Sequence, residues 1–290
     1  MKGIILAGGF GKRLNPLTRI ISKQLLPVYN KPMIYYPLSV LMLSKIKDIL
    51  IISTPKDSNN FKQLLGNGKQ LGINIKYAIQ KKPKGIAEAF LIAENFIKKD
   101  NVCLILGDNI FYGQYFYESL FKAQNINNGA TLFAYRVKDP SSYGVVEFDK
   151  NKNVISIEEK PKKPKTNYIA TGLYFYDNTV VEKTKKIKPS KRGELEITSV
   201  NLLYLKEKRL HSVLLGRGFA WLDTGTHENL SLASEFVKTI ENQQGFMIAC
   251  IEEIAFRNDW ITRKQLFILS KEYANTNYGE YLRIISNEKK

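Results

Sequence analysis

Residues 3–14 read Gly-Ile-Ile-Leu-Ala-Gly-Gly-Phe-Gly-Lys-Arg-Leu, and this stretch decides the fold class of the chain. Its apolar first part, Gly3–Ala7, has the length and character of a strand buried on both faces of a sheet. The glycines that follow allow backbone amides to approach a phosphate group closely. The stretch therefore predicts the first strand of an α/β sheet, followed by a phosphate-binding loop.

This loop belongs to neither of the two common phosphate-loop types. A dinucleotide fingerprint needs glycine where Leu14 stands, and an acid about 20 residues further on, where residues 29–31 supply none. A P-loop needs Ser or Thr directly after Lys12, where Arg13 stands. Arg13 instead offers a planar fork to phosphate oxygens, and Lys23 is a second nearby cation. Taken alone, the motif is also compatible with an ordinary strand–turn–helix junction that carries surface cations.

Strands and helices alternate in the first half of the chain. Apolar runs predict strands over 49–53, 73–79 and 102–106, and helical periodicity predicts helices over 33–44, 59–65 and 85–97. This alternation predicts an open, mostly parallel, Rossmann-like sheet with helices on both faces. After about Thr131 the chain becomes β-rich, with strands expected over 131–136, 145–149, 154–159, 169–176 and 212–215, and a turn at 149–152. Helices are expected over 194–206, 227–241 and 263–269. We expect a main domain over 1–240 and a helical C-terminal extension over 241–290.

The amino-acid composition and the charge of the chain exclude several classes of function. The 290 residues include 44 Lys and Arg against 27 Asp and Glu, a net charge of +17. The basic residues are spread along the chain rather than gathered in one stripe, so we expect neither nucleic acid nor a membrane as partner. No apolar run approaches the roughly 18 residues of a spanning helix, and the apolar start is short for a signal peptide. Two cysteines, Cys103 and Cys250, argue against a disulfide scaffold. The expected location is the cytoplasm.

Two acids stand at the ends of predicted strands or before a predicted helix. Asp108 follows the apolar run 102–106, at the sheet edge where ligands sit in open α/β folds. Mg²⁺ prefers one or two carboxylates together with substrate phosphates, so Asp108 is a candidate metal ligand. Asp223 lies in a Trp-Leu-Asp-Thr-Gly-Thr segment before a helix. For both residues, helix capping is the alternative interpretation.

A further charged motif, Glu159-Lys160-Pro161, closes a predicted strand. Neighbouring strand residues point to opposite faces, so Glu159 and Lys160 can serve one site only if the strand ends there, as Pro161 indicates. The alternative is a solvated charge run. His211 and His227 have no partners at metal-ligand spacing, so the sequence does not support a zinc site.

Taken together, these motifs resemble the sugar-phosphate nucleotidylyltransferases, and within them the bacterial branch of glucose-1-phosphate thymidylyltransferases. The resemblance covers nearly the whole chain, and its blocks lie at 3–9, 22–27, 31–38, 51–55, 143–148, 171–176, 192–198, 221–226 and 252–255. It implies transfer of a thymidylyl group from dTTP to α-D-glucose 1-phosphate with Mg²⁺, which gives dTDP-glucose and pyrophosphate on the route to dTDP-L-rhamnose and related sugars. It also implies a homotetramer. Uridylyl transfer, or another sugar 1-phosphate as acceptor, is the alternative.

The resemblance assigns roles residue by residue. The catalytic set that it implies is Arg13, Lys23, Asp108, Lys160 and Asp223, of which Asp108 and Asp223 hold the metal. The nucleotide-binding set that it implies is Leu6, Gly8, Gly9, Gly11, Arg13, Gln24, Gln80 and Gly85. The sugar-phosphate-binding set is Asn109, Tyr143, Gly144, Glu159, Lys160, Thr171, Gly172, Tyr174 and Arg192. A regulatory nucleotide site would include Tyr112, Gly113, Arg217 and Arg257.

The chemistry that the resemblance implies needs no general base. A phosphate monoester has a second pKa near ~6, so the sugar phosphate is already a nucleophile at neutral pH. Cations and metal are needed to bring two polyanions together in line. This chain departs from the family pattern at Phe10 and Lys12, where small hydroxyl residues are usual, and at Asn30 and Ile251, where Asp and Pro are usual. A non-catalytic, nucleotide-sensing relative would have lost Arg13 or one of the two aspartates, and all three are present.

Overall fold

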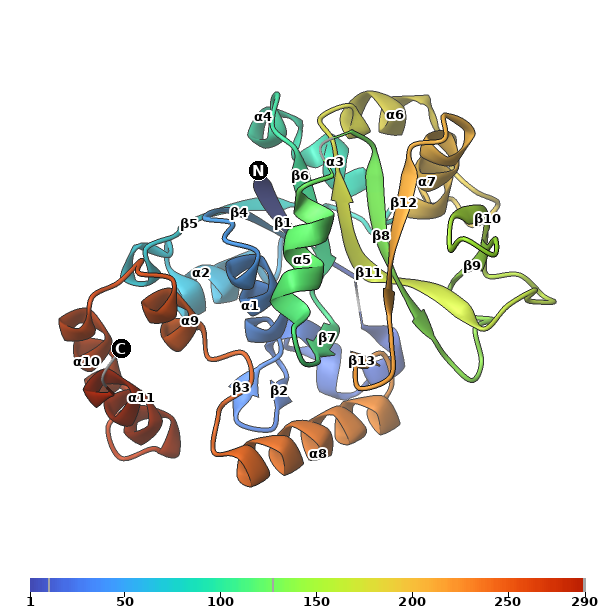
Figure 1. The fold of residues 1–290 in the computed structure, drawn as a ribbon. Helices are drawn as coiled ribbons and strands as arrows, with labels where there is room; N and C mark the ends of the chain where they lie inside the picture. Colours follow the sequence, from blue (N-terminus) through green and yellow to red (C-terminus); the bar gives the residue numbers. More distant parts are fainter. Residues whose placement is uncertain (10, 127, 289–290) are drawn as a thin grey trace.

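The computed structural model describes residues 1–9, 11–126 and 128–288. Within these residues the chain is built on a nine-stranded sheet ordered β10-β9-β11-β6-β1-β4-β5, with β8 paired to β11 and β12 paired to β8 (Figure 1). The strands of this sheet are β1 (Lys2–Ala7), β4 (Asp48–Ser53), β5 (Asn74–Ile79), β6 (Val102–Leu106), β8 (Ala130–Arg136), β9 (Gly144–Phe148), β10 (Val154–Glu159), β11 (Tyr168–Tyr176) and β12 (Leu210–Leu215).

The strand directions confirm the predicted architecture. β1 runs parallel to both β4 and β6, and β5 runs parallel to β4. β11 runs antiparallel to β6, β8 and β9, and so joins the parallel half to the β-rich half. Because β1 and β6 are parallel neighbours, the residues that follow them meet at one edge of the sheet. That edge carries the glycine-rich loop and Asp108.

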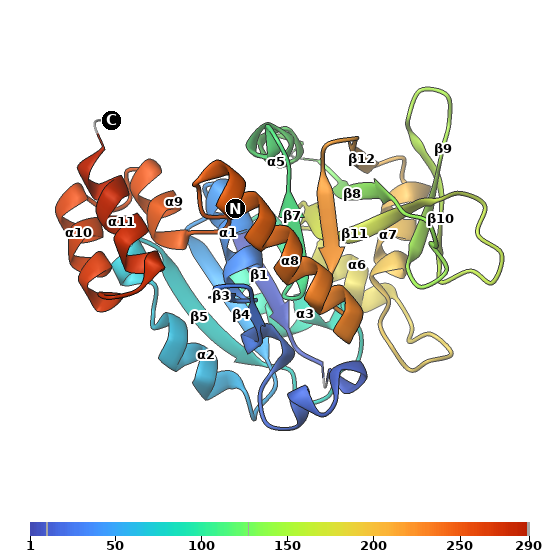
Figure 2. The same ribbon diagram turned by 90° about the horizontal axis from the view of Figure 1, so that it is seen from below.

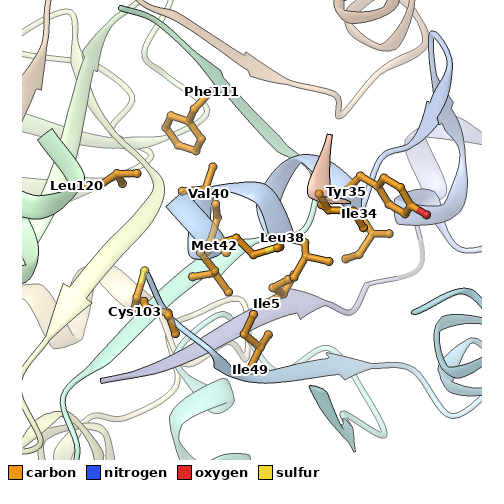
Figure 3. Close-up of a cluster of buried hydrophobic side chains, with 14 of the residues drawn as sticks. Ile5, Ile34, Tyr35, Leu38, Val40, Met42, Ile49, Cys103, Phe111 and Leu120 are labelled. Atoms are coloured by element: carbon orange, nitrogen blue, oxygen red, sulfur yellow. The ribbon is translucent and has the colours of Figure 1, made fainter. Parts of the chain in front are cut away.

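Helices cover both faces of the sheet, which explains why the central strands β1, β4 and β6 are continuously apolar. The strand predicted as buried over 73–79 is different, because β5 lies at the end of the strand order and exposes Asn74, Lys76 and Ile79. On β1, Ile5 joins one core cluster with Leu38 of α1 (Tyr35–Leu43) and Leu120 of α5 (Phe116–Gln124) (Figure 3). Its neighbour Ile4 joins a second cluster with Phe90 of α3 (Glu88–Ile92). The helices before the C-terminal extension are α1 (Tyr35–Leu43), α2 (Ser58–Leu65), α3 (Glu88–Ile92), α4 (Glu94–Ile97), α5 (Phe116–Gln124), α6 (Val180–Lys186), α7 (Ile197–Lys206) and α8 (His227–Gln244).

Some predicted helix boundaries are wrong for identifiable reasons. The helix predicted over 85–97 begins at Glu88 and breaks at Ala93, because Gly85 has φ +101°, outside the helical region, and Ala93 turns out of it with ψ 4°. The helix predicted over 194–206 begins at Ile197, because Glu196 is extended and its carboxylate accepts hydrogen bonds from Ser190 and Arg192. The helix predicted over 33–44 spans Tyr35–Leu43.

Two short strand pairs lie outside the main sheet and were not predicted. β2 (Pro27–Val28) pairs with β3 (Lys31–Pro32), and β7 (Asn109–Tyr112) pairs with β13 (Ala220–Asp223). The second pair joins the residue after Asp108 to Asp223, which are far apart in the chain. It therefore builds the site described below.

The C-terminal helices α9 (Ile251–Arg257), α10 (Arg263–Glu272) and α11 (Asn277–Asn287) lie at the β5 end of the molecule, opposite β9 and β10 (Figures 1 and 2). Polar contacts hold these helices to one another, because the Tyr273 and Tyr278 hydroxyls donate to Glu252 of α9. The Asn258 amide, just after α9, donates to the Met42 carbonyl at 2.9 Å and so joins the extension to α1. Nearby, Lys31 of β3 forms a 2.7 Å ion pair with Glu241 of α8. No helix among the described residues is long and apolar enough to cross a membrane. Cys103 and Cys250 are unpaired and buried.

Candidate active site

The pairing of β7 with β13 brings the two predicted metal ligands to one place. Asp223 stands opposite Asn109 in this antiparallel pair, and Asn109 directly follows Asp108. Thr224 closes the junction, because its hydroxyl donates to the Asp108 carbonyl at 2.9 Å. The sheet edge at the end of β6 thus carries both carboxylates.

The pKa values of the two carboxylates are shifted in opposite directions. Asp108 accepts a 2.6 Å charged hydrogen bond from Lys23 Nζ, and Lys23 is itself only 7 % exposed. Burial favours the neutral acid, but the charge and hydrogen bond of Lys23 outweigh it, so the pKa of Asp108 lies below its usual value. Burial, and then the charge of Asp108, raises the pKa of Asp223. The site therefore holds one carboxylate that is already paired and one that lacks a full counter-charge.

The glycine-rich loop forms the wall of a cavity next to these carboxylates. Its volume is about 260 Å³ and its lining residues are Gly8, Gly9, Gly11, Lys12, Arg13, Lys23, Gln24, Asp108 and Gly225. The absence of a side chain at Gly225 leaves room for Arg13, because a methyl group there would lie 2.8 Å from Arg13 Nη2 and 3.1 Å from Asp223 Oδ1. The structure thus brings Arg13, Lys23 and both aspartates together, as the sequence motifs predict. Phe10 lies outside the described residues.

An adjoining cavity of about 240 Å³ contains Gln80 together with Gly9 and Lys23. Gln80 follows β5 and is 4 % exposed. Its amide nitrogen donates to Glu88 Oε2 at 2.8 Å and lies 3.4 Å from the Gly85 carbonyl oxygen. Its amide oxygen lies against Gly8, where a methyl group would come within 2.5 Å. Gln80, Gly85 and the glycine-rich loop are therefore neighbours.

A second group of predicted residues gathers where β9 and β10 pair. Glu159 stands opposite Gly144, and its carboxylate accepts from Thr198 and, at 3.2 Å, from Arg192. β10 ends at Glu159, and Lys160 has φ +46°, so the chain does turn there, as Pro161 indicates. The Lys160 amide donates to the Tyr143 carbonyl at 2.9 Å, and its ammonium lies 4.0 Å from Glu159.

Tyr143 links this group to the aspartates. Its hydroxyl donates to Asp223 Oδ2 at 3.2 Å. Burial, then the charge of Asp223 and this hydrogen bond, raises the pKa of Tyr143 to about 12, so the hydroxyl stays protonated at neutral pH. The predicted nucleotide and sugar-phosphate residues therefore lie in one connected region.

Other predicted binding residues use their side chains mainly within the protein. Asn109 Oδ1 accepts from Trp221 and from the Gly172 amide, and Thr171 donates to the Phe133 carbonyl. Leu6 is buried in the core of β1, the Gln24 side chain accepts from Ser22, and the Tyr174 ring stacks on Tyr176. These residues shape the site through packing and backbone placement.

The predicted regulatory residues are only partly brought together. Tyr112 and Gly113 line a cavity of about 290 Å³ at the end of β7. Arg257 of α9 does not line it, but pairs with Glu253, which does. Arg217 is exposed in the turn between β12 and β13 and does not line this cavity. The four residues thus do not form a single site within one described chain.

Sequence reasoning missed Glu88, Thr198 and Glu196, which hold Gln80, Glu159 and Arg192 in place. Glu196 and Thr198 lie in the 192–198 block of the resemblance, but the block itself assigns them no role, and Glu88 lies in no block. The partners of Glu88 and Thr198 come from other elements of the fold, which local sequence does not show. The departure at Asn30 also has an explanation in the structure: its amide donates to Glu241 of α8 at 2.7 Å, beside the buried ion pair of Glu241 with Lys31.

Comparison with known proteins places these features in context. Residues 2–240 match the nucleotidyl transferase family. The chain is 59 % identical over 282 residues to a glucose-1-phosphate thymidylyltransferase of Neisseria meningitidis, covering 97 % of this chain and 98 % of the relative. It is 53 % identical over 282 residues to the protein of the same name from Mycobacterium tuberculosis, covering 97 % and 98 %.

Solved structures agree in fold. A Bacillus anthracis protein assigned as a glucose-1-phosphate thymidylyltransferase, in complex with sucrose, matches with TM-score 0.76 and 42 % identity, covering 81 % of this chain and 94 % of that one. A UDP-glucose pyrophosphorylase complexed with UDP-glucose matches with TM-score 0.71 and 22 % identity, covering 82 % and 98 %. The second likeness concerns the fold alone.

Proposed function

The chain belongs to the nucleotidyl transferase family and to its glucose-1-phosphate thymidylyltransferases, and from this membership we propose that it transfers the thymidylyl group of dTTP to α-D-glucose 1-phosphate. The products are dTDP-glucose and pyrophosphate. The observation that carries the proposal is the meeting of Arg13, Lys23, Asp108 and Asp223 beside the cavity of the glycine-rich loop. Two polyanions can react only where positive charge offsets their repulsion, and this region supplies it.

The two aspartates fit a magnesium ion. Their oxygens are the hard donors that Mg²⁺ prefers, and Mg²⁺ usually takes one or two carboxylates and completes its shell with substrate phosphates. The raised pKa of Asp223 indicates a carboxylate with insufficient counter-charge, which a divalent cation would supply. We therefore propose Asp108 and Asp223 as its ligands. When bound, the ion would neutralise charge on the transferring phosphate and the leaving pyrophosphate.

The nucleotide end of the reaction rests on the glycine-rich loop. Backbone amides of Gly8, Gly9 and Gly11 approach the triphosphate, since no side chains stand in the way. Arg13 binds phosphate oxygens through its planar fork, and Lys23 holds Asp108 in place while its charge faces the same cavity. Gln80, which lies beside Gly85, contacts the thymine base of dTTP.

At the acceptor end, Glu159 and Arg192 bind the sugar and its phosphate, and Lys160 lies beside them. No general base is needed, since the sugar phosphate is largely dianionic at neutral pH. One of its oxygens attacks the α-phosphorus of dTTP, and the bond from this phosphorus to the bridging oxygen of pyrophosphate breaks. The chain contributes by holding the two anions in line.

Replacing Lys160 with methionine tests the acceptor end, because it keeps the side-chain stem and deletes the charge. We expect the KM for glucose 1-phosphate to rise and kcat to fall, with little change in the KM for dTTP. Without the ammonium of Lys160, the phosphates of glucose 1-phosphate and dTTP would repel each other more strongly in the site than they do in water. The matched control is Lys163→Met, in the exposed segment that follows. Steady-state kinetics that are alike for the two variants would place Lys160 in a solvated charge run instead.

A substrate panel tests the proposed function itself. Purified protein is given Mg²⁺, one nucleotide (dTTP, UTP, ATP, GTP or CTP) and one sugar 1-phosphate, of either glucose or an amino sugar, and pyrophosphate release is followed. We expect the highest kcat/KM with dTTP and glucose 1-phosphate. A higher value with UTP would favour the uridylyltransferase alternative, and release with no pair would reject both.

We also propose, from the same membership, that the chain acts in the cytoplasm as a homotetramer and feeds the formation of dTDP-L-rhamnose or related sugars. The second nucleotide site proposed for Tyr112 and Gly113 would then be completed at a subunit interface, since Arg217 lies apart from their cavity within one chain. The residues 241–290, which comprise the last turn of α8 and the helices α9–α11, are the proposed interface and regulatory extension.

A further inference from the structure

We propose that Glu88 is a positioning residue that fixes which way round the Gln80 amide faces, and so selects thymine and uracil over cytosine. The inference rests on the proposed function, because it assumes that a thymidine nucleotide binds with its base against Gln80. It adds a residue outside the predicted nucleotide set. Glu88 is the first residue of α3, eight positions after Gln80.

The geometry fixes the amide orientation. Gln80 Nε2 lies 2.8 Å from Glu88 Oε2. An ionised carboxylate only accepts hydrogen bonds, so the nitrogen of the amide must be the atom that faces it. A reversed amide would set its oxygen against the carboxylate, with loss of a charge-assisted hydrogen bond and repulsion in its place. Glu88 therefore holds the amide oxygen on the side of Gly8, where the cavity lined by Gln80 adjoins the cavity lined by Gly8.

Each end of this amide offers one atom to a ligand. The oxygen near Gly8 is an acceptor. The second N–H of the nitrogen faces the Gly85 carbonyl at 3.4 Å, a long contact that a ligand acceptor can replace. Gln80 thus presents a hydrogen-bond acceptor, its amide oxygen, beside a donor, its amide nitrogen. Glu88 determines on which side each of the two atoms lies.

This order separates the pyrimidines. Thymine and uracil place a donor at N3 and an acceptor at O4, whereas cytosine places an acceptor at N3 and a donor at N4. In one pose of the ring, thymine and cytosine therefore need opposite orientations of the same amide. A freely turning glutamine serves both, because its two ends are nearly equal in shape. A glutamine held by Glu88 serves only one.

A purely structural role for Glu88 is the competing explanation, since an acid in the first turn of a helix stabilises it through the helix dipole. Loss of that role would lower stability and depress activity with every nucleotide alike. It would leave the ratio of kcat/KM between nucleotides unchanged. The ratio is therefore the readout that separates the two roles.

The experiment measures kcat/KM for dTTP, dUTP and dCTP with glucose 1-phosphate and Mg²⁺, for the full-length wild type and Glu88→Gln. Glutamine at position 88 can face either end of the Gln80 amide, so the restraint is lost. We expect the dTTP:dCTP ratio to fall by roughly 10- to 100-fold, the equivalent of a lost hydrogen bond to a charged group. The dTTP:dUTP ratio should not change, because both bases share the same edge. Glu94→Gln is the matched control: Glu94 begins α4 and pairs with Lys185 at 2.6 Å.

Each outcome separates this inference from the proposed function. A wild type that is inactive with dTTP rejects the proposed function. A wild type that is active with dTTP but uses dCTP equally well, or a Glu88→Gln variant with an unchanged dTTP:dCTP ratio, rejects the role of Glu88 alone. If Glu88→Gln does not fold, Glu88→Ala is measured with the same nucleotides, since it also removes the restraint and carries the same expectation.

Discussion

Replacing Asp223 with asparagine is expected to lower kcat by about 100- to 1,000-fold, the usual cost of losing one electrostatic stabiliser of a transition state. Asparagine keeps the shape of the side chain, and its oxygen can still accept from Tyr143. What it removes is the charge that would bind Mg²⁺. Asp108→Asn should lose at least as much, because it also deprives Lys23 of its buried partner.

Kinetics at saturating substrate and varied Mg²⁺ measure this effect, with circular dichroism to confirm folding. Asp149→Asn is the control, since Asp149 is a half-buried aspartate at the turn after β9 that accepts backbone hydrogen bonds from Asn151 and Asn153. Near-normal turnover of both Asp108→Asn and Asp223→Asn would contradict their assignment as metal ligands.

Loss of Lys31 should have the largest effect on stability. Its ammonium is buried against Glu241, with side-chain exposures of 1 % and 6 %. Lys31→Met leaves the carboxylate buried without its cation, which typically costs about 3–5 kcal/mol in the free energy of unfolding. Lys31→Met combined with Glu241→Gln should recover part of that loss, because the uncompensated charge is gone.

Urea unfolding at neutral pH measures these differences. Lys185→Met is the control, because Lys185 pairs with Glu94 and Glu182 on the surface, where ion pairs contribute little. If Lys31→Met were as stable as Lys185→Met, the buried pair would not be a principal attachment of α8 to the β2–β3 segment.

The core of the fold could be predicted from local sequence because each buried strand carries its own signal. β1, β4 and β6 are continuous apolar runs, whereas β5 is interrupted by Lys76 and partly exposed. The predicted ranges of all four strands agree with the structure to within one residue. The two-residue strands β2 and β3 carry no such signal. β7 and β13 are also short, each with a polar residue at one end, Asn109 and Asp223, so their pairing could not be predicted from either segment alone.

The candidate site also contains residues that local sequence identifies and residues that it does not. Arg13, Lys23, Asp108 and Asp223 belong to motifs that identify their chemistry, and the sheet edge after β1 and β6 explains why three of them meet. That Asp223 joins them depends on a pairing between segments more than 100 residues apart. Glu88 and Thr198 are absent from the predicted set because their roles consist of contacts to other predicted residues.

The identity of the reaction products tests most directly whether this region joins the two substrates by nucleotidyl transfer. Wild-type protein, dTTP, α-D-glucose 1-phosphate and Mg²⁺ are incubated, and the products are separated and identified by mass spectrometry. We expect dTDP-glucose and pyrophosphate in equal amounts, with neither formed when the sugar phosphate is omitted. Formation of dTDP and inorganic phosphate, or of dTMP and pyrophosphate without a sugar nucleotide, would contradict this proposal.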